Sequence, residues 1–324
     1  MSVAKHIRPL LPEESQEWIH IFQKATGTHP FTSLPFLVAY QRAVPQFKAK
    51  AMGVFEDSRL VGGFPIFERH LGPFQRAVNP PLVPYGSPFW LPDQHPDEIF
   101  YAVLQYLNKT YHSAVMECTP QSVSHLRIAP QQWQQYPRKT LYRTLGDPAE
   151  TLKSVSSKRR NAFRRASESL FFQPMTPVSE ELVQLVAASY ARHGRPLPLL
   201  PTQLTTLIQQ LQAHQIATIC TAALQSEPQK PVAMAVFLTL HECSYYWLAG
   251  MQPCPPLEPM AFLLLSAFSY FYEQSIKTID FMGANHPSIA AFKRKFADQE
   301  IPYVYVKSTS NQALYVLEWM RNLR

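Results

Sequence analysis

Residues 278–306 place the strongest constraint on how this chain can fold. They read TIDFMGANHPSIAAFKRKFADQEIPYVYV. The opening five residues are β-branched, aromatic or apolar around one aspartate, which is typical of a buried strand, and Gly283 can adopt the positive φ that ends it. After a short polar loop, Pro287 can begin a helix with apolar residues at helical spacing. A second strand is expected over residues 301–306. In such a unit, the loop at the carboxyl end of the first strand is the usual place for a ligand.

The helix expected after Pro287 carries three consecutive basic residues, Lys293 to Lys295, mostly outside its apolar stripe. Such a run is typical of a solvated face, and it can also offer cations to an anionic ligand. Phe292 in the helix and Asn285 and His286 in the loop are candidate ligand contacts. A loop histidine more often caps a helix or lies on the surface than acts as a base.

A second basic segment, SVSSKRRNAFRRASESLF, predicts a helix over residues 157–169 that Ser156 or Ser157 can cap. It contains five cations within eight residues, interleaved with apolar positions: Lys158, Arg159, Arg160, Arg164 and Arg165. Few acidic residues lie nearby in the sequence to pair with them. Because guanidinium groups are bidentate donors, the helix is a candidate for gripping phosphate or another polyanion. A water-facing basic surface is the alternative.

Both segments resemble a known family. The Asp-Phe strand, the glycine, the short loop, and Phe-Lys two residues before Lys-Phe are similar to the C-terminal signature of the FemAB-like branch of the GNAT acyltransferase superfamily. Several residues of the basic helix also fall where that family's K-x-R-N-x-x-R-x-A pattern would place them: Lys158, Arg160, Asn161, Arg164 and Ala166. The resemblance covers the chain from about residue 15 and implies two tandem GNAT-type halves.

The order of expected elements agrees with such a tandem arrangement. Two helices, an antiparallel run of strands, a further helix and closing strands occur twice, which predicts an α+β fold with two mixed, mostly antiparallel sheets flanked by helices. We expect the halves to be residues 1–138 and 139–324, with the basic helix in the second. The resemblance would place the Pro- and Gly-rich loop at residues 71–92 over a substrate groove. A surface loop stiffened by prolines is the alternative.

The resemblance implies transfer of an acyl or aminoacyl group to an amine, by attack on an ester or thioester carbonyl. Lys293 matches the family's recurring functional lysine and would act as an electrostatic stabiliser or phosphate clamp. Asp280 at the strand end and Tyr245 or Tyr246 on a middle strand are candidate proton relays, although strand tyrosines are mostly core residues. No residue is a convincing nucleophile, so no covalent acyl-enzyme is expected. We expect Lys293 and Arg160 to face a shared cavity.

The sequence constrains the identity of the acyl donor less than it constrains the type of reaction. GNAT folds that use acyl-CoA bind its pyrophosphate with an R/Q-x-x-G-x-G/A loop, whereas the corresponding residues 250–260 read GMQPCPPLEPM, with four prolines and no second glycine. FemAB-like members similarly lack that loop and take the acyl group from aminoacyl-tRNA. Aminoacyl-tRNA and acyl-CoA both stay open as donors.

Composition limits the partners and the cellular location that we expect. A net charge of +7 over 324 residues favours an anionic partner, such as a phosphate-bearing donor or acceptor, or tRNA. The longest apolar run, residues 260–268, is too short to cross a bilayer and no secretory signal is evident, so we expect a cytoplasmic protein. The four cysteines lack metal-ligand spacing, so we expect no metal site. Exposed sheet edges would permit a homodimer. A noncatalytic anion- or RNA-binding protein on a degenerate GNAT fold is the alternative function.

Overall fold

A computed structural model describes residues 5–128, 132–285, 287–309 and 314 of the chain. The described residues divide into two compact units, one within Met1–Arg138 and Pro302–Arg324 and the other within Lys139–Ile301. Residues Gln299–Thr309 of the last strand fall partly in each unit, because the first unit resumes at Pro302. None of the described helices is long and apolar enough to cross a membrane.

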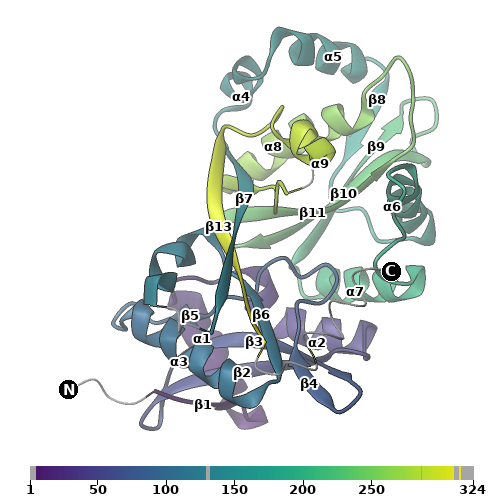
Figure 1. The fold of residues 1–324 in the computed structure, drawn as a ribbon. Helices are drawn as coiled ribbons and strands as arrows, with labels where there is room; N and C mark the ends of the chain where they lie inside the picture. The colour runs from purple at the N-terminus through teal and green to yellow at the C-terminus, as the bar shows by residue number, and fades with distance from the viewer. Residues whose placement is uncertain (1–4, 129–131, 286, 310–313, 315–324) are drawn as a thin grey trace. The chain divides into compact units, whose positions relative to one another are not determined.

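The first unit is an α+β unit whose strands are mostly antiparallel (Figure 1). The pairings β1 with β2, β2 with β3, β3 with β4 and β5, and β6 with β13 are antiparallel, while β4 and β6 are parallel. Its elements are β1 (Lys5–Pro9), α1 (Ser15–Lys24), α2 (Leu34–Ala43), β2 (Lys48–Glu56), β3 (Arg59–Leu71), β4 (Phe74–Ala77), β5 (Phe89–Trp90), α3 (Pro96–Thr110), β6 (Ser113–Glu117) and the first part of β7 (Gln134–Thr144), together with the last part of β13 (Gln299–Thr309) and the short 3-10 helices Pro12–Glu14, Pro30–Thr32 and Pro120–Ile128.

The core of the first unit forms where the apolar stripe of α3 meets the sheet. Ile99, Val103 and Leu104 of α3 cluster with Met52 and Phe64 of β2 and β3, and all five are buried. These helix residues recur at three- and four-residue spacing, which places them on one face. The segment expected as a loop at residues 71–92 contains two short strands, β4 and β5.

The second unit repeats this plan. Strands β12 with β7, β11 with β10, β10 with β9, and β9 with β8 pair antiparallel, while β11 and β12 are parallel. Its elements are the end of β7, α4 (Pro148–Ser154), α5 (Ser157–Ser167), β8 (Leu170–Gln173), α6 (Glu180–Arg192), α7 (Pro201–Ala213), β9 (Ala217–Leu224), β10 (Pro231–Leu240), β11 (Cys243–Met251), α8 (Pro259–Glu273), β12 (Thr278–Asp280), α9 (Pro287–Lys293) and the start of β13.

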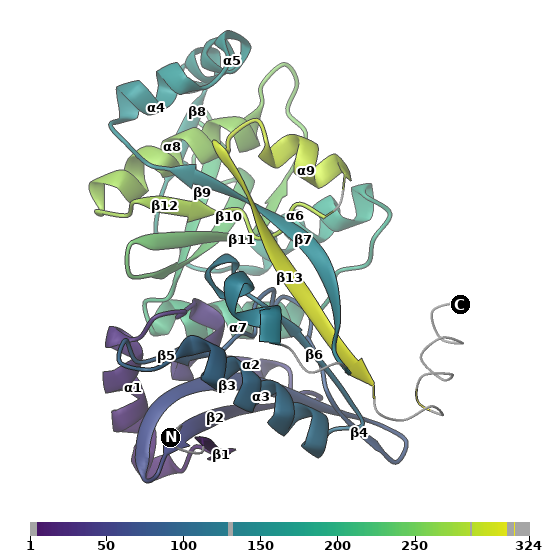
Figure 2. The same ribbon diagram turned by 60° about the vertical axis from the view of Figure 1, so that its left-hand side comes forward.

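Helices cover both faces of the second sheet. The apolar helix α8 lies on one face, with α4 and α5 packed on its outer side, and α6 and α7 lie against the other face (Figures 1 and 2). Helix α6 approaches β11 very closely at Gly250, where an added Cβ atom would lie 2.3 Å from the backbone carbon of Leu185. Only glycine permits this approach, which fixes the middle of α6 beside the end of β11.

Serine side chains cap two of the helices, and the cap of the basic helix is one that the sequence predicts. The Ser33 side chain accepts from the Phe36 N–H at the start of α2, and the Ser156 side chain accepts from the Arg159 N–H at the start of α5. These contacts satisfy donors that the first helical turn leaves free. The expected basic helix over residues 157–169 is α5, which ends two residues earlier.

Candidate functional site

The candidate site lies where two parallel strands of the second unit separate. Strand β12 pairs with β11 only from Cys243–Thr278 to Tyr245–Asp280, and then β12 ends while β11 continues to Met251. The pairing of β11 with β10 has a bulge at Trp247, since Val236 pairs with Leu248 and Phe237 with Tyr246. Bulges bend a strand and re-aim its side chains. The remainder of β11 therefore forms one wall of an opening in the sheet.

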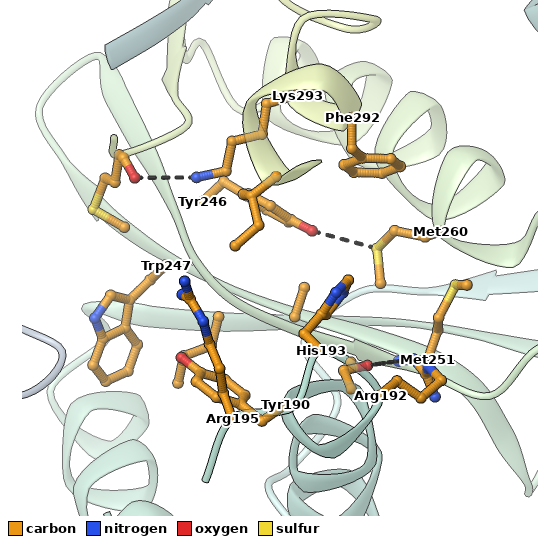
Figure 3. A pocket seen from close by; sticks show the side chains of 16 residues that line it. Tyr190, Arg192, His193, Arg195, Tyr246, Trp247, Met251, Met260, Phe292 and Lys293 are labelled. Carbon is orange, nitrogen blue, oxygen red and sulfur yellow. Dashed lines mark hydrogen bonds between the residues drawn. The ribbon is translucent and has the colours of Figure 1, made fainter. Parts of the chain in front are cut away.

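A cavity of about 400 Å³ occupies this opening (Figure 3). Its walls are residues 246–251 of β11, the end of α6 with the loop that follows, Met260 of α8, and Met282, Ile289, Phe292 and Lys293 from the turn and helix after β12. The volume is within the usual range for small-molecule sites. No acidic residue lines the cavity among the described residues.

Lys293 is the buried cation of this cavity. Its side chain is 9% exposed, and its ammonium donates to the carbonyls of Phe281, Met282 and Gly283 at 2.5, 3.1 and 2.9 Å. Burial lowers the pKa of Lys293 from 10.5 to about 8, while the charge of Asp280 acts in the opposite direction. A charge held in such a water-poor site acts more strongly on a ligand than one on the surface.

The turn after β12 places these carbonyls around the ammonium. Met282 and Gly283 both have positive φ, at 48° and 77°. Gly283 adopts this conformation without steric cost, whereas Met282 is held in it. The Met282 N–H donates to Oδ1 of Asp280 at 2.7 Å, and the same oxygen accepts from the Thr140 hydroxyl at 2.6 Å. Asp280 thus fixes the turn on which Lys293 depends.

Asp280 and Tyr245 do not line the cavity, unlike their neighbours Met282 and Tyr246. Asp280 is fully buried. It shares a buried cluster with Tyr245 and Tyr142, whose hydroxyl pKa values are raised mainly by burial and further by the Asp280 charge. The structure therefore separates these two predicted proton relays from the space a ligand would occupy.

Tyr246 is the adjacent tyrosine that reaches the cavity. Strand alternation sends it to the face opposite Tyr245, and its hydroxyl donates to the sulfur of Met260 at 3.5 Å (Figure 3). Burial raises the pKa of Tyr246 above its ordinary value.

The other contacts predicted near α9 lie in different places. Phe292 lines the cavity beside Lys293. Asn285 is exposed and does not line it, and its side-chain oxygen accepts from the Lys139 N–H at 3.2 Å. His286 lies outside the described residues.

The basic helix α5 does not contribute to the cavity. Arg160 donates to the carbonyls of Lys153 and Val155, at 2.9 and 2.5 Å, and so satisfies acceptors at the end of α4. Lys158 and Arg164 are exposed. The structure therefore does not bring Lys293 and Arg160 to one cavity as the sequence suggested.

Three basic residues that lie at the cavity instead were not among the predicted anion contacts. Arg192, His193 and Arg195, at the end of α6, line the side opposite Lys293 (Figure 3). Arg192 donates to the Ser189 hydroxyl at 2.7 Å, and neither arginine forms an ion pair with a carboxylate of the described residues. The sequence signal available for them was HGRP, basic residues beside a glycine and a proline, but only packing shows that they face the cavity.

Comparisons with known proteins give a consistent fold. FemX matches with a TM-score of 0.69 at 12% identity, over 96% of this chain and 99% of that one. L-PGS from Bacillus licheniformis matches with a TM-score of 0.58 at 14% identity, over 96% of this chain and 95% of that one. The chain has a FemAB-like GNAT fold. The predicted fold class is confirmed: two α+β units whose strands are mostly antiparallel and flanked by helices.

A tandem GNAT protein from the clavulanic acid biosynthesis pathway is also similar in fold to this chain, with a TM-score of 0.57 at 12% identity over 95% of this chain and 99% of that one. No family model and no curated protein matches the sequence. Within this fold, the described residues contain no group of three or more histidine, cysteine, aspartate or glutamate side chains that could hold a metal ion.

Proposed function

We propose that the protein transfers an acyl or aminoacyl group to an amine, with the cavity of the second unit as the active site. The observation that carries this proposal is the buried Lys293 ammonium in a cavity that the separation of β11 and β12 opens and that no described acid lines. The cavity has cations on two sides and an apolar wall between them. It suits a reactant with an anionic carrier and a carbonyl group.

The reaction requires no covalent enzyme intermediate. The amine nitrogen attacks the carbonyl carbon, a C–N bond forms, and the bond from that carbon to the carrier oxygen or sulfur breaks. The proton lost by the amine is transferred to the departing carrier atom. Negative charge develops on the carbonyl oxygen during attack, and a fixed positive charge nearby stabilises it.

Lys293 supplies that charge. Its hydrogen bonds to three backbone carbonyls already engage its donors, so it acts on the reactant through its charge rather than by transferring a proton. His193 lines the same cavity, and we propose its imidazole as the group that passes the proton from the amine to the departing carrier. Asp280 has a positioning role in this scheme, and Tyr245 is buried outside the cavity.

The loop before α8 supports an aminoacyl ester over acyl-CoA as donor. A pyrophosphate at a helix start needs backbone N–H groups, and Pro253, Pro255, Pro256 and Pro259 have none. We propose aminoacyl-tRNA as the donor, with acyl-CoA as the alternative that the same assay tests.

Binding of RNA or another polyanion without catalysis is the second candidate, and α5 favours it. Lys158, Arg164 and Arg165 are exposed and form no ion pair with a carboxylate of the described residues. Cations without local partners provide the electrostatic part of nucleic-acid binding.

The test incubates the purified protein with charged tRNA or acyl-CoA and three amines, namely lysine, ethanolamine and a glycine-terminated peptide. New amide bonds are detected by mass spectrometry. Lys293→Met should lower turnover by about 100-fold or more. Lys295→Met removes an exposed charge two residues away and should leave turnover unchanged. Equal turnover in both variants would contradict the proposal, and tRNA binding without any amide product would favour the second candidate.

A further inference from the structure

A second hollow opens beside the cavity, between β11 and α8. It has a volume of about 250 Å³ and lies between Met251 and Ala261, and we call it the proline hollow. Four of its lining residues are prolines: Pro253, Pro255, Pro256 and Pro259. It shares Met251, Met260 and Phe292 with the cavity, and these side chains lie along one side of Figure 3. The two spaces are therefore adjacent, and a ligand that occupies both passes along these three side chains.

The walls of the hollow offer little to a polar ligand. Prolines present CH₂ groups and no N–H, and Leu257, Met251 and Phe292 add apolar surface. The one charged lining residue, Glu258, pairs with Arg159, whose guanidinium lies 5.2 Å from the centre of the Phe296 ring. That pairing leaves the hollow without an unmatched charge. The hydrophobic effect therefore favours an apolar group there.

The loop is fixed at its start and by a turn within it. The Gln252 N–H donates to the carbonyl of Val232 at 2.7 Å, and the Leu257 N–H donates to the carbonyl of Cys254 at 2.8 Å. Helix α8 begins directly after, at Pro259. The hollow is thus a defined part of the unit, with basic residues on the cavity side and hydrocarbon on its own side.

We propose that the proline hollow binds the apolar part of the transferred acyl group, so that the protein selects long-chain or bulky apolar acyl or aminoacyl groups over small or polar ones. This inference rests on the proposed function. The anionic end of the ligand faces Lys293, Arg192 and Arg195, and the hydrocarbon lies against Leu257 and the prolines. The complementarity of a charged end and an apolar end is what favours this occupant.

Calorimetric titration of the full-length protein with butanoate, hexanoate, octanoate and decanoate tests the proposal without turnover. The carboxylate is constant along this series, so a change in affinity reports the alkyl chain alone. Affinity should rise about fourfold for each added methylene until the hollow is filled. Affinity that does not change with chain length would overturn the inference.

Variants at Leu257 test whether the proline hollow causes the dependence of affinity on chain length. Leu257→Trp narrows the hollow and should reduce the decanoate affinity to that of butanoate. The matched control is Leu200→Trp, at a leucine that is 64% exposed and lines neither space. It should bind the four carboxylates with wild-type affinities. Leu257→Ala enlarges the hollow, so the increase in affinity should continue to longer chains. Wild-type behaviour in both Leu257 variants would also overturn the inference, and circular dichroism verifies that each variant folds.

The inference and the proposed function can fail separately. If binding depends on chain length but no amide forms, the result would support apolar binding in the proline hollow and contradict the proposed transferase activity. Equal transfer rates from glycyl and leucyl esters of one tRNA would overturn acyl selection and leave the transferase standing.

Discussion

The ammonium of Lys293 donates to the carbonyl of Gly283 at 2.9 Å, which ties the end of α9 to the turn after β12. Because the Phe281 and Met282 carbonyls also accept from it, one side chain both charges the cavity and holds its wall. This double role makes the pH dependence of Lys293 measurable through stability as well as activity.

We expect Lys293 to reduce stability near neutral pH. Its pKa is lowered to about 8 in the folded protein from 10.5, so the unfolded chain binds more protons between these values and stability rises with pH there. The gain is on the order of 3 kcal/mol over the whole window. Urea unfolding of wild type and Lys293→Met from pH 7 to 9.5 should show wild type gaining relative to the variant. A constant difference would contradict the lowered pKa.

Replacing Asp280 should weaken the turn and alter Lys293. Asp280→Asn removes a buried carboxylate that accepts from Thr140 and Met282, which should cost about 1–3 kcal/mol of unfolding free energy. It also removes the negative charge that favours the Lys293 ammonium, so the pKa of Lys293 should fall further. Denaturant titration and NMR detection of the ammonium measure the two effects. Asp57→Asn, at an exposed turn, should change neither.

Different residues of α5 should contribute to stability and to polyanion binding. Arg160→Ala removes donors to two carbonyls and should cost about 1–2 kcal/mol of unfolding free energy. The double variant Arg164→Ala and Arg165→Ala should fold normally. In filter binding of tRNA over a salt series, it should reduce the slope of log affinity against log salt by about one to two units.

The charge-matched control for that pair is Lys24→Ala with Lys109→Ala, both exposed residues of the first unit. An unchanged salt slope in the α5 variant, or an equal reduction in the control, would argue against a binding surface on α5.

Glu117, a carboxylate in the first unit, should make stability depend on pH in the direction opposite to that of Lys293. Burial raises the pKa of Glu117 to about 7, although Tyr303 and Asn79 donate to it and favour its charged form. The folded protein then binds more protons than the unfolded chain between about pH 4.5 and 7, so stability is lost as pH rises through this window.

Glu117→Gln should therefore remove that loss, on the order of 3 kcal/mol over the window. Urea unfolding at pH 5 to 7.5 measures it. The exposed control Glu13→Gln should follow wild type, and a Glu117→Gln protein that loses stability in parallel with wild type would disprove the assignment.

The sequence by itself determined the local elements and their repetition. Period-two and period-3.6 patterns depend on near neighbours, so they predict strands and helices directly. Ser33 and Ser156 are predictable caps for the same reason, because a cap acts within one turn. The tandem FemAB-like arrangement and the choice of Phe292 and Lys293 as candidate site residues followed from residues that are close in the sequence.

Only the tertiary structure decided which side chains share the cavity. Tyr245 and Tyr246 are adjacent and chemically alike, yet strand alternation and the bulge at Trp247 send only Tyr246 to the cavity. Arg195 reaches the same cavity as Lys293 across about a hundred intervening residues, while Arg160 turns back to α4. Such contacts depend on how distant elements pack and on their register, and no local pattern in the sequence encodes them.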